Sequence, residues 1–248
     1  MRSTTINYQA YENYTKHDQD VWKLLFDRQI SQLPNLASEA YIEGIEIAGL
    51  TAERIPNFTT ELNPRLLEQT GWEVVVVPGL IPVEDFFKLM SNRKFPSSTW
   101  LRTEKQLDYL EEPDMFHDTF GHVPLLTNQA FCDFLAKISK IALDYIDDEE
   151  AIIQLQRLYW YTVEFGLIRE DGKLKIYGGG ILSSSGESQY SLFSDIPKRI
   201  NYDVARIMQT EVKIDEFQKQ YFVIESYEQL YNSLPEVEQV LRGVKETA

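Results

Sequence analysis

Apolar residues recur at helical spacing over most of this chain, and this pattern limits the fold more than any other feature of the sequence. Helices are predicted over residues 21–32, 36–47, 83–90, 128–147 and 149–166, with further helical pieces around residues 66, 207 and 230–234. Pro or Gly bounds the first three of these segments, as expected at helix ends. The pattern therefore favours a mostly helical protein.

Signals for β-structure are few. Residues 72–77 form a short run of strand-forming side chains that ends at Pro78. Residues 167–169 and 174–177 flank the pair Asp171-Gly172, which supplies the turn chemistry of a hairpin. We expect a mostly α fold with a small amount of β.

Length and charge narrow the class of protein. The 248 residues contain no repeat and no linker rich in Pro, Gly or Ser, which indicates one compact domain. Asp and Glu number 39 and Lys and Arg 24, so the net charge of −15 disfavours binding to nucleic acid or an anionic membrane. The single cysteine, Cys132, and the absence of a signal peptide or membrane span predict a soluble cytoplasmic protein.

Two of the three histidines, His117 and His122, lie in one short window. Residues five apart on an α-helix are about 140° apart around its axis, so a continuous helix would not aim both at one metal ion. Gly121 in the left-handed conformation would end the helix and turn His122 back, and Pro124 would prevent the helix from resuming. The two imidazoles would then converge.

The helix that carries His117 would begin at Asp114 or Glu112, beside Pro113. Glu164 lies among bulky apolar residues and needs a cation or a strong partner if it is buried. Two imidazoles and one carboxylate form the facial triad of non-haem Fe(II) oxygenases. From the residues alone, two alternatives stay open: a pair of structural histidines, and a Glu164 that faces solvent or pairs with an arginine.

A Gly- and Ser-rich stretch at residues 177–188 is not a nucleotide-binding or nucleophile motif. It lacks the Gly-Lys-Ser/Thr ending of a phosphate loop, the last glycine of a dinucleotide fingerprint and the Gly-x-Ser-x-Gly of a nucleophile elbow. Its glycines indicate a tight strand exit or close packing on a ligand. Ser183 and Glu187, one helical turn apart, could point into the same cavity.

Taken together, these motifs resemble the pterin-dependent aromatic amino acid hydroxylases, and most closely the short bacterial phenylalanine 4-hydroxylases. The stretches that match are residues 70–82, 107–114, 117–126, 159–169, 177–187 and 217–224. The likeness runs from about residue 21 to about residue 231. It implies a catalytic domain of this type over residues 21–234, preceded by an N-terminal extension at 1–20 and followed by a C-terminal tail at 235–248.

The resemblance also implies the chemistry. Fe(II) would be held by His117, His122 and Glu164, tetrahydrobiopterin or a related tetrahydropterin would donate electrons, and O₂ would be the cosubstrate. The product of L-phenylalanine would be L-tyrosine.

Residue by residue, the resemblance places Arg102 on the substrate carboxylate and Ser183 beside the first histidine ligand, with Glu187 helping to hold Arg102. The substrate ring would lie against Pro113, Trp160, Phe165 and Gly180. The pterin site would be formed by Gly79, Ile81, Phe86, Asp118 and Tyr159.

Some positions depart from the animal members of the family. Asp118 replaces a Glu, Leu110 a Thr near the substrate, and Pro96 a histidine on the pterin side. The short N-terminal extension and the lack of a long C-terminal heptad helix predict a monomer without a regulatory domain.

Several alternatives for the activity remain at this stage. Within the family that the chain resembles, Trp160 and Val223 favour phenylalanine over tryptophan and tyrosine as the substrate. A phenylalanine 3-hydroxylase or another aromatic amino acid hydroxylase would share nearly every motif. A zinc hydrolase with Asp118 as general base, and a binding protein that has lost the chemistry, are the alternatives from other classes.

Overall fold

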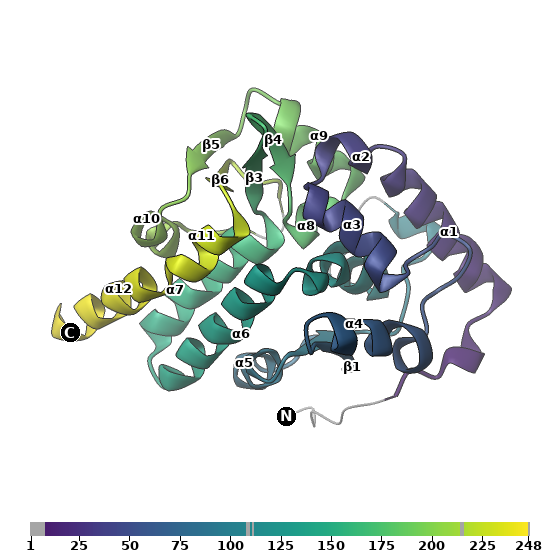
Figure 1. Ribbon diagram of the computed structural model, residues 1–248, viewed down its shortest axis with the longest axis horizontal. Coiled ribbons are helices and arrows are strands. Elements are labelled where there is room, and N and C mark those ends of the chain that lie inside the picture. Colours follow the sequence, from purple (N-terminus) through teal and green to yellow (C-terminus); the bar gives the residue numbers. More distant parts are fainter. Residues whose placement is uncertain (1–7, 108–109, 111, 214–215, 248) are drawn as a thin grey trace.

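The computed structural model describes residues 8–107, 110, 112–213 and 216–247 (Figure 1). Of the motif at 107–114, residues 108, 109 and 111 therefore lie outside the described part of the chain. The α-helices are α1 Lys16–Ile30, α2 Leu33–Leu36, α3 Glu39–Ala48, α4 Asn63–Gln69, α5 Val83–Ser91, α6 Gln129–Asp144, α7 Glu149–Tyr159, α8 Gly179–Leu182, α9 Ser185–Phe193, α10 Val204–Gln209, α11 Tyr227–Asn232 and α12 Leu234–Thr247. The mostly helical prediction is confirmed.

Shorter helical turns connect these elements. Three are 3₁₀ turns, Tyr11–Asn13, Glu104–Gln106 and Val123–Thr127, and three are π-helical, Phe58–Leu62, His117–His122 and Trp160–Glu164. The last of these continues α7 directly, so the helix predicted over residues 149–166 changes from α to π at Trp160.

Polar caps determine where the helices begin. The side chains of Thr15, Ser38, Asn128 and Asp148 each accept a backbone N–H from the first turn of α1, α3, α6 and α7. Such caps satisfy donors that have no partner within the helix. Gly49 ends α3 with a φ of 71°, which glycine adopts without steric strain.

The strands form two small sheets. β1 (Glu73–Val76) pairs in parallel with β2 (Lys94–Ser97), and a four-stranded sheet has the order β4-β3-β6-β5. In this sheet β3 (Leu167–Glu170) and β4 (Lys173–Ile176) form the predicted antiparallel hairpin, whose turn residues Asp171 and Gly172 both have positive φ. β6 (Gln220–Ile224) lies between β3 and β5 (Lys198–Asn201) and is parallel to both. The sequence analysis did not predict β2, β5 or β6.

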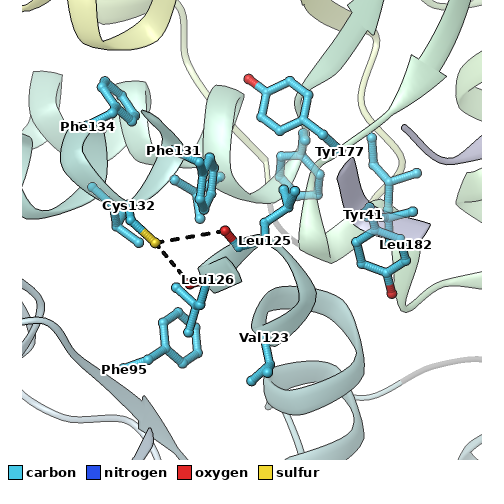
Figure 2. Packing of buried hydrophobic residues seen from close by; sticks show 14 of the residues in the cluster. Tyr41, Phe95, Val123, Leu125, Leu126, Phe131, Cys132, Phe134, Tyr177 and Leu182 are labelled. Carbon is cyan, nitrogen blue, oxygen red and sulfur yellow. Dashed lines mark hydrogen bonds between the residues drawn. The ribbon is translucent and has the colours of Figure 1, made fainter. Parts of the chain in front are cut away.

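The core lies between the helices and the four-stranded sheet. In Figure 1, α6 and α7 run side by side beneath this sheet. Cys132 is fully buried in α6, and Figure 2 shows its thiol against the carbonyls of Leu125 and Leu126, with the Sγ–O distance to Leu126 at 3.1 Å.

No helix of the described residues is long and apolar enough to cross a membrane.

Gly44 permits the close packing of α3 on the 3₁₀ turn that follows His122. A Cβ atom at this position would overlap the backbone of Pro124. We expect Gly44→Ala to destabilise the protein by about 1–3 kcal/mol, because a backbone cannot yield as a flexible side chain does. In thermal unfolding this corresponds to a midpoint lower by roughly 2–10 °C.

Gly243→Ala is the matched control. Gly243 lies in α12, and a Cβ there would meet no atom within 4 Å. Alanine favours a helix over glycine by up to about 1 kcal/mol, so this variant should be as stable as the parent or more so. A Gly44→Ala variant that melts with the parent would show that α3 does not need this close approach.

Candidate metal centre and adjoining pocket

His117, His122 and Glu164 converge at one point. The Nε2 atoms of the two histidines are 3.2 Å apart, and Glu164 places Oε1 3.2 Å from His122 Nε2 and Oε2 3.7 Å from His117 Nε2. Ligand atoms about 2.1 Å from a single ion and roughly at right angles to each other are separated by about 3 Å. The spacing of these three side chains therefore suits one metal ion.

The histidines converge through a π-helical turn, and the predicted role of Gly121 is wrong. His117–His122 is a π turn, in which residues five apart lie about one turn apart on the same face. Gly121 is not among the glycines with positive φ. The 3₁₀ turn Val123–Thr127 follows directly and has Pro124 in its first turn. The chain therefore stays helical at Pro124, although it does not continue as an α-helix.

Gly121 is needed for close packing instead. A Cβ on Gly121 would lie 2.6 Å from the carbonyl oxygen of Gly179, and a Cβ on Gly179 would lie 2.5 Å from the His122 ring. Gly180 has a similar role, because its Cβ would lie 3.0 Å from Glu164 Oε2. The glycine run thus packs on the side chains of the metal centre, whereas the sequence predicted a tight strand exit or close packing on a ligand.

Hydrogen bonds orient the ring of His117. Ser183 donates its hydroxyl to the carbonyl of Gly180 at 3.2 Å, and its Oγ lies 2.9 Å from His117 Nδ1. A Ser183 hydroxyl that donates to Gly180 accepts from Nδ1–H of His117, and this pairing would leave Nε2 unprotonated for a metal ion. Burial lowers the pKa of His117 to about 4, so its imidazole is neutral at pH 7.

The carboxylate of Glu164 fits a cation. Its side chain is buried, and Oε2 has no hydrogen-bond partner among the described residues. Burial alone would raise the pKa of Glu164, but the charge and hydrogen bond of His122 bring that pKa below its usual range. A buried carboxylate with an unpartnered oxygen, facing two imidazole nitrogens, is a donor set suited to divalent iron.

A cavity of about 280 Å³ adjoins these three side chains. The residues of the predicted pterin and substrate sites that line it are Gly79, Ile81, Phe86, Pro113, Asp118, Tyr159 and Trp160. The rings of Phe86 and Tyr159 meet edge to face with their centroids 5.3 Å apart. The rings of Trp160 and Phe165 are stacked with their centroids 5.7 Å apart. Flat aromatic ligands fit such a wall.

Asp118 lies at the inner end of the cavity, beside His117. The backbone N–H of Ser98 donates to its Oδ2 at 2.8 Å. Burial raises the pKa of Asp118 to about 7.

Arg102, Phe165, Gly180, Ser183 and Glu187 do not line the cavity. Phe165, Gly180 and Ser183 lie directly behind residues that do, through the contacts with Trp160, Glu164 and His117 given above. The expectation that Ser183 and Glu187 point into the same cavity is wrong. Glu187 accepts a hydrogen bond from the hydroxyl of Tyr221 at 2.7 Å instead.

Asp114, and not Glu187, holds Arg102. The Nε and Nη2 atoms of Arg102 donate to Oδ2 and Oδ1 of Asp114 at 2.9 and 2.8 Å, and this ion pair is buried. Oδ1 also accepts the backbone N–H of His117 at 3.0 Å, as predicted for a residue that begins the helix. The pairing expected between Arg102 and Glu187 is therefore wrong.

The sequence analysis also missed Ser98 and Gln156, which line the cavity. Helical spacing offered a signal for Gln156, because residues three and four before Tyr159 and Trp160 share their face of the helix. For Ser98 we find no such signal.

The comparisons with known proteins identify the class. A family model described as "Biopterin-dependent aromatic amino acid hydroxylase" matches residues 5–243. The chain belongs to this family.

The names of its relatives are more specific than that of the family. The chain is 49% identical to a phenylalanine-4-hydroxylase of Ralstonia nicotianae over 91% of its own length and 71% of the relative's, and 48% identical to that of Chromobacterium violaceum over 91% and 75%. A crystal structure of the Chromobacterium violaceum enzyme with bound iron(III) and 7,8-dihydrobiopterin superimposes with a TM-score of 0.90 at 46% identity, covering 96% of this chain and 86% of that one. The cobalt-bound form of the same enzyme gives 0.91 at 45% identity, covering 97% and 88%.

Replacing Ser183 tests the orientation of His117. We expect Ser183→Ala to weaken metal binding by roughly 10- to 100-fold, the range typical of groups that orient a ligating histidine. Titration of the metal-free protein with Fe(II) under anaerobic conditions measures this change. Ser185→Ala, two residues away on α9, is the control, and equal affinities for the two variants would show that the Ser183 hydroxyl does not orient the ring.

Glu187 should make stability depend on pH. Burial, together with the charge of Glu164, raises the pKa of Glu187 to about 7 from an ordinary 4.5. The folded state therefore favours the protonated form, and this contribution to stability is complete below pH 4.5 and lost as the pH rises through 7. At most about 3 kcal/mol is lost in that window.

The variant Glu187→Gln keeps an oxygen for Tyr221 and does not titrate. Urea unfolding of the metal-free protein should show this variant gaining stability on the parent between pH 5 and pH 8. Parallel pH profiles would mean that the pKa of Glu187 is the same in the folded and unfolded chains.

Proposed function

We propose that this protein is a phenylalanine 4-hydroxylase, which converts L-phenylalanine to L-tyrosine with O₂, a tetrahydropterin and Fe(II). The observation that carries the proposal is the convergence of His117, His122 and Glu164 at one end of an aromatic-walled cavity. Family membership and the phenylalanine-4-hydroxylases at 48–49% identity support the same activity.

His117, His122 and Glu164 would hold the iron through one face, which leaves its other positions open to the cavity. Iron and the reduced pterin together supply the activation of O₂. The protein's own contribution is to keep His117 in the ligating tautomer through Ser183 and to exclude water with an apolar wall. The resulting low dielectric strengthens every polar contact inside.

We assign the wall formed by Gly79, Ile81, Phe86, Asp118 and Tyr159 to the pterin. We assign Pro113 and Trp160 to the substrate ring, with Phe165 and Gly180 supporting them from behind.

Arg102 is assigned to the substrate carboxylate. Asp114 takes two of its five N–H groups, and the carbonyl of Leu107 accepts a third at 3.3 Å. Among the described residues no partner takes the remaining N–H of each terminal nitrogen, and this is the pair of donors that binds a carboxylate in bidentate fashion.

We further propose that residues 21–234 form the catalytic unit and that the protein acts as a monomer in the cytoplasm. The helix α12 continues past residue 234 and packs on this unit through the buried side chains of Val237 and Leu241. The lone buried thiol of Cys132 suits a reducing compartment.

The test is anaerobic reconstitution with Fe(II), followed by O₂, tetrahydrobiopterin and L-phenylalanine, with chromatographic separation of the tyrosine isomers. We expect para-tyrosine that depends on both iron and pterin. His117→Ala should abolish it, whereas His17→Ala, which replaces the exposed histidine of α1, should leave it unchanged. Meta-tyrosine as the product would show that the enzyme hydroxylates position 3 and not position 4 of the ring. Activity with Zn(II) alone would overturn the proposal.

A further inference from the structure

Gln156 is a polar side chain of the cavity that the proposed mechanism leaves without a role. Among the described residues that line the cavity, it has the only amide side chain. It is half-buried, and no hydrogen bond joins its amide to another described residue. Its donor and its acceptor are therefore both available to a ligand.

Gln156 lies at the end of the cavity away from the metal centre. It precedes Glu164 by eight residues on one continuous helical run, which at about 1.5 Å per residue places it on the order of 10 Å from that ligand. Gln156 is itself partly exposed, so this end of the cavity meets solvent, whereas Glu164 is buried. Val83, another residue that lines the cavity, is 37% exposed.

The aromatic wall lies between these two ends. Tyr159 follows Gln156 by one helical turn, and its ring meets that of Phe86. A pterin that donates electrons at the metal centre would have its bicyclic ring near His117, His122 and Glu164. Its C6 substituent would then be the part that can reach Gln156.

We propose that Gln156 is a specificity-determining residue that recognises the hydroxylated C6 side chain of the pterin. This inference rests on the proposed function. The 1,2-dihydroxypropyl group of biopterin carries two hydroxyls, and an amide offers one group that donates and one that accepts hydrogen bonds. Val83 and Leu80, which also line the cavity, have no polar side-chain atom to offer.

The experiment compares two cofactors that differ only in this substituent. Calorimetry measures the binding of 7,8-dihydrobiopterin and of 6-methyl-7,8-dihydropterin to the iron-loaded protein without turnover. We expect Gln156→Leu to weaken dihydrobiopterin about 3- to 10-fold, the range of one neutral hydrogen bond, and to change the methyl pterin less than about twofold. Under turnover, KM for tetrahydrobiopterin should rise by a similar factor while kcat is retained.

Gln69→Leu is the matched control, because it makes the same substitution on an exposed position of α4 away from the cavity. It should bind both pterins as the parent does. Two results would overturn the inference and leave the proposed function intact. One is that Gln156→Leu weakens the binding of both pterins equally, as a misfolded variant would. The other is that the binding of dihydrobiopterin does not change. A parent protein that binds neither pterin would overturn the proposed function itself.

Discussion

The convergence of two imidazoles and a carboxylate in a buried space is the constraint on which the rest of the structure depends. His117 and His122 point their Nε2 atoms at each other at 3.2 Å, and Glu164 has a buried oxygen with no hydrogen-bond partner in the part of the chain that the structure describes. In an apolar interior this arrangement is unfavourable without a cation, because each group has lost water and gained no complete set of hydrogen bonds. The elements around it must therefore be rigid enough to hold it in place.

That rigidity comes from two π turns and the glycines that pack on them. A π turn is rare and usually found at functional sites, and here one turn carries both histidines while another carries Glu164. The run Gly178–Gly180 brings α8 against both turns at distances that no side chain would allow. Ser183 stands at the end of the same short helix, so the packing of α8 also determines the position of the group that orients His117.

Features that depend on neighbouring residues could be predicted from the sequence, and features that depend on distant ones could not. Asp171-Gly172 determines its own hairpin turn, and the helices follow from apolar spacing and polar caps. β6 takes both of its partners from remote segments, and β2 contains Pro96, which argues against a strand unless it lies at an edge. Gly121 could not be interpreted from its neighbours for the same reason. A glycine permits either a positive φ or close packing, and the residue on which Gly121 packs, Gly179, is distant in the sequence.

The ligands of the metal centre and the residue assigned to the substrate carboxylate are joined by a single side chain, Asp114. One of its oxygens accepts the backbone N–H of His117, and both bind Arg102. Although burial acts to raise it, the pKa of Asp114 is lowered by Arg102, so the pair stays charged. A buried ion pair adds little to stability over apolar packing, but removing one partner strands a charge at a cost of about 3–5 kcal/mol. We infer that the pair serves geometry: it places a guanidinium at a set distance from the turn that carries His117, so one carboxyl group positions both the arginine proposed for the substrate carboxylate and a histidine proposed for the metal.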